Sequence, residues 1–144
     1  MRIYRRSKRK NPYRTLAGAQ RAKITKECED YLRKILRHER GEKCEICGKK
    51  SGKVGLFHIL PKGRYPNIRF NKFNLLLACW FPCHFFFHHD PFKARKILDR
   101  IKELRGPDFE DKLKIISRME GKMSICKLTM YRESLKKEIE RIGV

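Results

Sequence analysis

The chain has 144 residues, of which 40% are hydrophobic and 10% aromatic, enough for one compact domain with a modest core. Its 37 lysines and arginines outnumber 16 acidic residues, and the net charge of +21 predicts a polyanionic partner, a nucleic acid above all. No run of about eighteen apolar residues is found and no apolar segment follows the basic start, so neither a membrane span nor a secretory signal is predicted. Six cysteines, two of them isolated on predicted helix faces and expected in the core (Cys28 and Cys126), fit a reducing compartment, so we expect an intracellular protein.

The basic residues are concentrated in two stretches. Residues 1–14 contain seven basic side chains and no acid, and we expect residues 1–13 to form a flexible arm on nucleic acid. Residues 46–89 again contain no acid, which suits a surface that follows a phosphate backbone; a solvated basic surface is the plain alternative. The predicted DNA contacts are Lys62, Arg64, Arg69, Lys72, Arg5, Arg6 and Arg9.

Residues 14–41 are predicted to form one long helix. Apolar residues recur there at steps of three and four, from Ala19 through Cys28 to Leu36, with arginine and lysine on the other face. Gly41 follows the periodic run and is a typical helix stop. We expect the apolar stripe to pack on the core and the basic face to lie along DNA.

Two cysteine pairs enclose the middle of the chain. Cys44 and Cys47, followed by a glycine, have the form of a zinc knuckle, and Cys79 and Cys83 follow after an interval that suits a β-hairpin. Four thiolates on two tight turns predict a closed, tetrahedral Zn²⁺ site with a structural role. Four buried thiols without a metal are the plain alternative.

The second pair leaves the fourth zinc ligand open. Three residues separate Cys79 from Cys83, one more than in the usual knuckle, and a wider turn around Pro82 would absorb the addition. His84 comes directly after and is the alternative to Cys83 in the fourth position.

Between the cysteine pairs we expect two strands and a loop, with a helix after them. Residues 54–60 are predicted to form a strand that carries His58, and the prolines and glycine of residues 61–66 predict a loop. Residues 68–70 are expected to form a second, short strand, and residues 75–78 to lead into the second cysteine turn, with a helix from His84. This order predicts an α+β fold with a small zinc-stapled ββα core over residues 42–90.

Residues 91–144 are predicted to be helical, and with the core they make one compact domain. Asp90, Asp108 and Ser124 each stand where a side chain can cap a helix. The helices carry both signs of charge and an apolar stripe. We expect them to complete the core or to form the interface of a homodimer.

The central unit has residues suited to phosphodiester cleavage, which needs a base for water and a cation near the phosphate. His58 is the predicted general base, because an imidazole with a pKa of about 6.5 is largely neutral at working pH. His84 and His88 are one helical turn apart and are expected to share a divalent ion, Mg²⁺ or Mn²⁺. Asn74 is expected in the loop that joins strand to helix, where it would hold the loop in register or orient His58. Each of these residues has a plain alternative as a packing or loop residue; the predicted catalytic set is His58, Asn74 and His84.

The order His58, Asn74, His84 resembles the HNH or ββα-metal nucleases. Residues 66–74, PNIRFNKFN, begin eight residues after His58 and end five before Cys79, and here the chain resembles more closely the phage NinG (Rap) recombination proteins. The resemblance covers about fifty of the 144 residues. It implies an endonuclease for branched recombination intermediates such as Holliday junctions, with structural zinc on the four cysteines. It also implies a phage, prophage or viral origin, with the protein acting in the cytoplasm or nucleoid of the host cell.

The chain departs from that pattern at Phe57, where many HNH enzymes have an Asp or His that binds the catalytic ion. The ion would then depend on His84 and His88, with Asn74 or Asp90. This departure supports a second hypothesis, a non-catalytic zinc-containing protein that binds DNA or RNA. A third hypothesis is a sequence-specific HNH enzyme of the homing or restriction type, although no separate recognition domain is predicted.

Overall fold

The computed structural model describes residues 15–50 and 54–144, so the predicted arm with Arg5, Arg6 and Arg9 lies outside the described residues. The chain is α+β and mostly helical, and its described part contains one two-stranded antiparallel sheet. Within that part, no helix is long and apolar enough to cross a membrane. The elements are α1 (Leu16–Arg40), β1 (Val54–His58), β2 (Leu75–Cys79), α2 (Phe85–His89), α3 (Pro91–Arg105), α4 (Phe109–Met119) and α5 (Ile125–Ile142).

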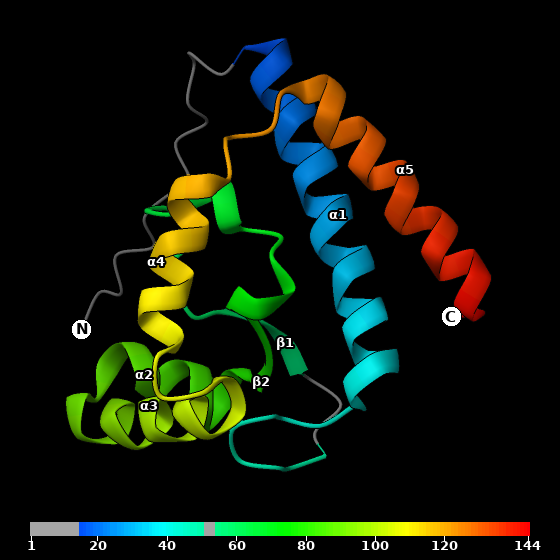
Figure 1. Cartoon of the computed structure of the whole chain (residues 1–144). Helices are drawn as coiled ribbons and strands as arrows, with labels where there is room; N and C mark the ends of the chain where they lie inside the picture. The colour runs from blue at the N-terminus through cyan, green and yellow to red at the C-terminus, as the bar shows by residue number, and fades with distance from the viewer. Residues whose placement is uncertain (1–14, 51–53) are drawn as a thin grey trace, which may run out of the picture.

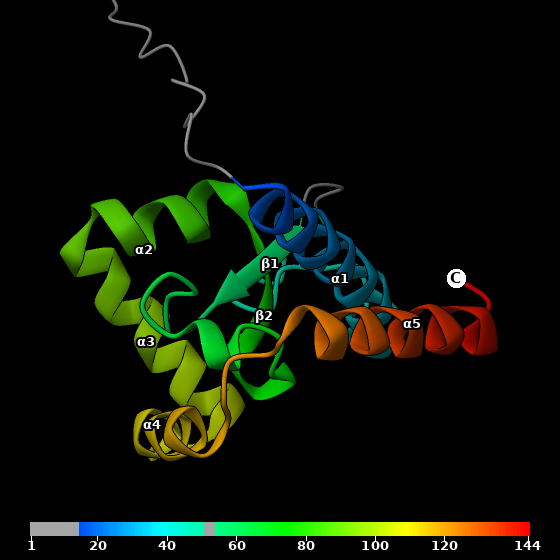
Figure 2. The same cartoon turned by 90° about the horizontal axis from the view of Figure 1, so that it is seen from above.

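The hairpin lies between two groups of helices. α1 and α5 pack side by side on one face, and α2, α3 and α4 gather on the other (Figure 1, Figure 2). Leu75 and Leu77 of β2 join the apolar cluster of α1 and α5, whereas Leu76 and Ala78 join that of α3 and α4. Successive strand residues point to opposite faces, so this small sheet is buried on both.

The second strand is not where the sequence predicted it. Residues 68–70 form no strand, since Ile68 ends a 3-10 turn, Pro66–Ile68, and a further turn follows; the strand that pairs with β1 is β2. Every residue of β2 is buried, and helices cover both of its faces, so its sequence lacks the alternation that marks a half-buried strand. β1 is also shorter than predicted, ending at His58, which lies opposite Leu75.

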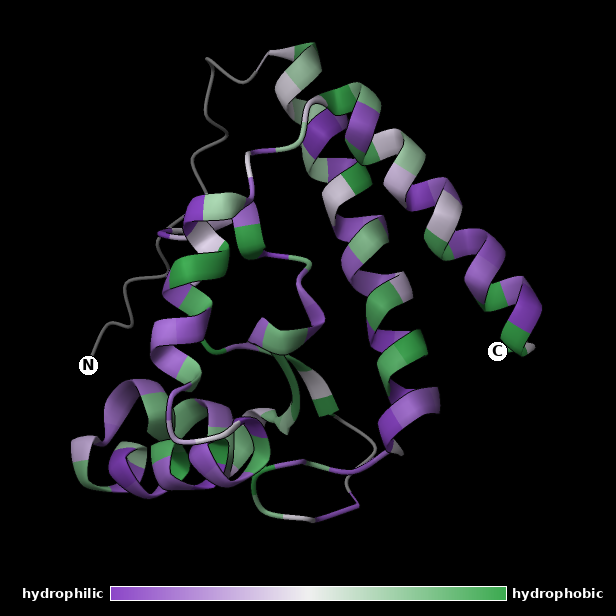
Figure 3. Cartoon of the chain, viewed as in Figure 1, coloured by the Kyte–Doolittle hydropathy of each residue, from purple (hydrophilic) through white to green (hydrophobic). Residues whose placement is uncertain are grey.

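α1 and α5 form the larger helical face. The hydroxyl of Thr15 accepts a hydrogen bond from the N–H of Gly18 and caps α1, which ends before Gly41. Both ribbons alternate hydrophilic and hydrophobic residues, as expected of helices with one buried side (Figure 3). Leu128 and Leu135 of α5 are buried in the same cluster as the apolar residues of α1. The stripe of the last helix therefore completes the core of this chain.

Two local predictions need correction. Asp108 precedes α4, but its side chain makes no capping bond and instead pairs with Lys112 at 3.3 Å. Cys126 is exposed on α5, whereas Cys28 is fully buried as predicted. Asp90 does cap α3, accepting from two backbone N–H groups of the first turn at 3.0 and 3.1 Å.

Candidate metal centre and histidine site

The first cysteine turn is closed by local backbone geometry. The N–H of Cys47 lies 3.4 Å from Sγ of Cys44, and the N–H of Gly48 donates to the carbonyl of Cys44 at 2.8 Å. Gly48 has a φ of 74°, in the left-handed region that glycine adopts without steric cost. The glycine after the second cysteine thus lets both thiols point the same way.

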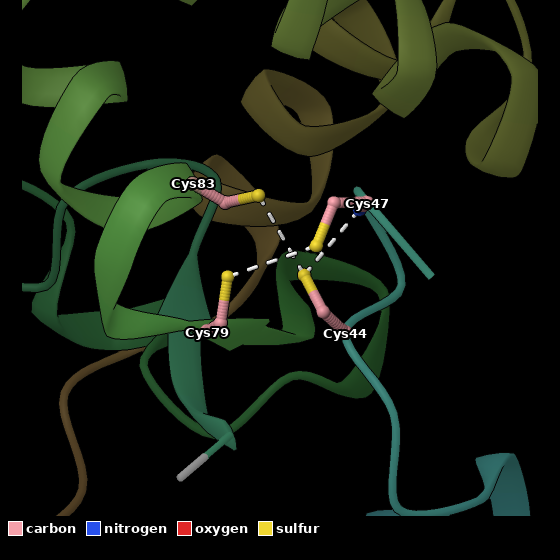
Figure 4. A group of neighbouring side chains, drawn as sticks. All are labelled: Cys44, Cys47, Cys79 and Cys83. Carbon is pink, nitrogen blue, oxygen red and sulfur yellow. Dashed lines mark hydrogen bonds between the residues drawn. The ribbon is translucent and has the colours of Figure 1, made fainter. Parts of the chain in front are cut away.

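The second turn accommodates its additional residue by widening. Trp80–His84 forms a wide turn in which Phe81 is extended (φ −127°, ψ 130°) and the bond from Phe81 to Pro82 is cis, and it leads directly into α2. Cys79 is the last residue of β2, and Cys83 lies inside the wide turn. The strand end and the turn together aim both thiols at the first knuckle (Figure 4).

The four cysteine thiols meet in one cluster (Figure 4). Their sulfur atoms all lie within 4.8 Å of one another, with 3.7 Å from Cys44 to Cys83 and 3.8 Å from Cys47 to Cys79. Four sulfurs about 2.3 Å from a central Zn²⁺ would be about 3.8 Å apart in a tetrahedron. The tetrad therefore fits a structural zinc ion, and Cys83, rather than His84, belongs to it.

The thiols differ in how readily they lose their protons. Burial opposes ionisation of Cys44, but backbone N–H groups of Cys47, Cys79 and Ile46 bond its sulfur and bring its pKa down to about 7. Burial, reinforced by the neighbouring Cys44, raises the pKa of Cys79, and burial with the surrounding thiols raises that of Cys83. A metal must displace these protons, so zinc affinity should fall as the pH falls.

Glu45 ties the first knuckle to the sheet, a role that no sequence pattern indicated. Its N–H donates to the carbonyl of Leu77 at 2.8 Å, and its carboxylate accepts the N–H of Leu77 at 2.5 Å. Arg40 lies 3.3 Å from the same carboxylate. The N–H and carbonyl of Leu77, on the edge of β2 that faces away from β1, are thereby hydrogen-bonded. These bonds fix the first cysteine turn to β2.

His58 sits at the end of β1 with its side chain 9% exposed. Its Nε2 lies 3.1 Å from the carbonyl oxygen of Arg69, and since a carbonyl only accepts, Nε2 carries the proton. Burial lowers the pKa of His58 to about 4, against the opposing effect of Glu29. His58 is therefore neutral at physiological pH, with Nδ1 unprotonated.

The second ring nitrogen of His58, Nδ1, is the atom with the free lone pair. No hydrogen bond to it is found among the residues that the structure describes, where Nε of Arg37 is the sole buried side-chain nitrogen or oxygen without a partner. Nδ1 is thus an acceptor without a donor among the described residues. This is the atomic arrangement that a general base requires.

Glu29 of α1 reaches across to this strand end. Its Oε1 lies 2.7 Å from Nε of Arg69, 3.4 Å from Nζ of Lys62 and 3.9 Å from Nε2 of His58. Burial opposes ionisation of Glu29, but the bond to Arg69 and the nearby positive charges bring its pKa below the ordinary value. A carboxylate from the first helix therefore belongs to the surroundings of His58, and the sequence analysis missed it.

Asn74 is fully buried directly before β2, not in a loop between strand and helix as the sequence predicted. Its Oδ1 accepts the N–H of Leu60 at 2.7 Å, and its Nδ2 donates to the carbonyl of Leu60 at 3.2 Å. The N–H of Ile59 also donates to the Asn74 carbonyl, at 2.9 Å. Of the two expected roles, the bonding pattern matches the one in which Asn74 holds the connecting loop.

His84 and His88 face each other across one helical turn, with ring centroids 5.0 Å apart. Phe57 is fully buried and packs against both rings, at centroid distances of 5.3 Å to His84 and 6.4 Å to His88. Burial lowers the pKa of His84, with contributions from His88 and Lys62. Lys62 likewise lowers that of His58, so it stands near both parts of the predicted site.

Among the described residues, no third protein ligand joins these two histidines. Asn74 is occupied by its bonds to the loop, and Asp90 caps α3. In the described parts of the chain, the cysteine tetrad is the one group of three or more His, Cys, Asp or Glu residues close enough to share an ion. His84 and His88 therefore offer a pair of imidazoles without a carboxylate.

Three of the four predicted DNA contacts in the described chain are held by acids of the flanking helices. Lys62 and Arg69 pair with Glu29, and Lys72 pairs with acids of α1 and α5 at 2.6 and 3.8 Å. Arg64 is exposed in the loop between β1 and β2. The surface around His58 is consequently less positive than the local sequence implied.

A basic cleft is lined by Lys62 and Arg69, the two basic residues that pair with Glu29, although His58 itself does not line it. The cleft has a volume of about 800 Å³ and lies between α1, the loop after β1 and the start of α5. Glu120 is the one acid among the described residues that line it. Its basic residues come from distant parts of the sequence, and three of them were not predicted as contacts: they are Arg21, Lys62, Arg69, Lys122 and Lys127.

No protein-family model, curated protein or solved structure matches this chain. Function must therefore be argued from the site itself.

Proposed function

We propose that the chain is a metal-dependent DNA endonuclease of the ββα-metal kind, with His58 as general base, that acts on branched recombination intermediates such as Holliday junctions. The observation that carries the proposal is the state of His58. Its Nε2–H is held by the Arg69 carbonyl, which leaves Nδ1 as the nitrogen with the lone pair. The preference for branched DNA rests on the resemblance to the NinG proteins.

In the proposed reaction, Nδ1 of His58 takes a proton from a water molecule as its oxygen bonds to phosphorus. The bond from phosphorus to the leaving oxygen breaks, and that oxygen takes up a proton from solvent. The bond to the Arg69 carbonyl holds the imidazole in one tautomer throughout. Asn74 keeps the strand end and the following loop in place by its two bonds to Leu60.

His84 and His88 are the residues that would hold the catalytic ion. Two imidazoles without a carboxylate suit Mn²⁺ or a softer divalent metal better than Mg²⁺, which prefers oxygen ligands. Such an ion, when bound, supplies Lewis-acid stabilisation of charge on the phosphate and leaving oxygen. The basic cleft supports a polyanionic substrate.

The test is cleavage of a labelled four-way junction and a matched linear duplex with Mn²⁺ or Mg²⁺. His58→Gln can still donate to the Arg69 carbonyl but cannot act as a base, and it should lower the cleavage rate by about 100-fold or more. His38→Ala removes an exposed histidine on α1 and should leave cleavage unchanged. Cleavage by the His58→Gln protein at the wild-type rate would refute the assignment.

A second function, a zinc-containing protein that binds nucleic acid without cutting it, is favoured by one observation. Phe57 packs against His84 and His88 at the position where a third metal ligand would be expected. This alternative predicts salt-sensitive binding, with log affinity falling by roughly 0.9 per duplex phosphate neutralised, and no turnover with any divalent ion. The same assay, read for binding as well as cleavage, separates the two.

A further inference from the structure

Three aromatic side chains next to the zinc turn are exposed to solvent. Trp80 is 63% exposed, Phe81 65% and Phe85 37%. The rings of Phe81 and Phe85 pack at a tilt of 51° with centroids 5.8 Å apart, and Trp80 packs on His84 at a centroid distance of 4.7 Å. We name Trp80, Phe81 and Phe85 the aromatic platform.

The platform lies at the margin of the apolar core, where Phe81 and Phe85 each pack on Phe86. Phe86 and Phe87, its neighbours in sequence, pack against the core, whereas none of the three platform residues belongs to either apolar cluster of the described chain. The zinc turn requires the thiols of Cys79 and Cys83 but not the rings between them. Grouped, exposed aromatic rings on a small protein mark an interaction surface.

The positive charge near the platform favours a negatively charged ligand. Lys93 stands 3.5 Å above the ring of Phe86, and that ring packs against Phe81 and Phe85 at centroid distances of 5.3 and 5.7 Å. The nearest acid in sequence, Asp90, is engaged in capping α3. Exposed rings bordered by cations are the arrangement that binds unpaired nucleobases, which stack on the rings while their phosphates meet the cations.

We infer that the aromatic platform stacks unpaired nucleobases and thereby gives the protein a preference for single-stranded segments over uninterrupted duplex. Bases in a duplex are already stacked on one another, so their faces are not available to the rings. Because Trp80 packs on His84, stacked bases would lie beside the proposed cleavage site. The placement next to the cut phosphate rests on the proposed function, but the binding does not.

Trp80 is the only tryptophan of the chain, so intrinsic tryptophan fluorescence reports on the platform alone. The experiment titrates the His58→Gln protein with oligothymidine or with a blunt hairpin duplex, without added divalent ions, at about pH 8, where histidines are neutral. Oligothymidine should quench the fluorescence and the hairpin should not. Binding of oligothymidine with unchanged Trp80 fluorescence, or no binding at all, would overturn the inference.

Substitutions test the same surface by affinity. Phe81→Leu and Phe85→Leu should each weaken oligothymidine binding by about five-fold or more and leave hairpin binding unchanged. Met130→Leu, at a 67% exposed apolar position on α5, should change neither affinity. Equal weakening of oligothymidine and hairpin binding would refute base stacking. A molecular mass in solution that is lower for the Phe81→Leu protein than for the wild type would also refute it, because the platform would then bind a second copy of the chain.

Failure of this inference can be told apart from failure of the proposed function. If the platform does not stack bases, junction cleavage that depends on His58 is still expected. If His58 has no role in cleavage, quenching of Trp80 by oligothymidine is still expected.

Discussion

Asn74→Ala should reduce the free energy of unfolding of the protein, and by more than Asn71→Ala does. The substitution removes both hydrogen bonds to Leu60, each contributing about 1 kcal/mol, and leaves the backbone N–H and carbonyl of Leu60 without their partner. Leu60 is half-buried, so water can replace part of what is lost. We expect the free energy of unfolding to fall by about 2 to 3 kcal/mol.

Urea unfolding followed by circular dichroism, at a fixed excess of zinc, measures this change. Asn71→Ala is the matched control, because Asn71 is less buried and its loss should cost about 1 kcal/mol. Asn74→Asp keeps the acceptor for the N–H of Leu60 but replaces the donor to the Leu60 carbonyl by a carboxylate oxygen, which repels it. This substitution should therefore also lower the free energy of unfolding at neutral pH. A loss for Asn74→Ala no larger than that for Asn71→Ala would show that the bonds to Leu60 do not hold the loop.

Other consequences concern the metal, the histidine and the knuckle. Cys83→Ser should abolish stoichiometric zinc binding, measured by metal analysis after dialysis. His84→Ala and Cys126→Ser, the latter at an exposed position, should retain one zinc per chain. Loss of zinc in His84→Ala would contradict the assignment of the four cysteines as the ligands. The fold lowers the pKa of His58 from 6.5 to about 4. Between these two pH values the unfolded chain protonates this histidine and the folded chain does not. The free energy of unfolding should therefore decrease as the pH falls from 6.5 to about 4, by at most about 3 kcal/mol. Urea midpoints across the same pH range should fall less steeply for His58→Gln, and an unchanged slope would mean that His58 is not buried in its neutral form. Glu45→Ala removes a buried acceptor and should lower the free energy of unfolding by about 2 kcal/mol; a change below about 0.5 kcal/mol would show that the bond to β2 contributes little.

The cysteine tetrad that fits a structural zinc ion was largely predictable from the sequence, because its determinants are local. A knuckle requires two cysteines and a glycine within five residues, and Gly48 adopts the positive φ that this turn needs. The wide turn that holds Cys83 was also expected from the additional residue in the second pair. Helix starts at Asp90 and Ser124 followed from capping chemistry, which acts over three residues.

The second strand could not be placed by pattern, because a strand covered on both faces has no alternation to read. LLLAC became recognisable as β2 only with α1 and α5 on one side and α3 and α4 on the other. The short segment at residues 68–70 has a stronger local resemblance to a strand, but β1 pairs with β2 instead. Burial on two faces is a property of the assembled fold and not of the segment.

The sequence by itself determined which reactive side chains are present and how they are spaced locally: four thiols on two turns, a histidine at a strand end, and two histidines one helical turn apart. The tertiary structure alone decided how these groups are surrounded. It brought Glu29 of α1 to His58, Lys62 and Arg69, and it placed Phe57 against His84. Spacing along the chain encodes contacts within a turn or a helix, whereas contacts between distant segments depend on how the two apolar clusters pack the helices against the sheet.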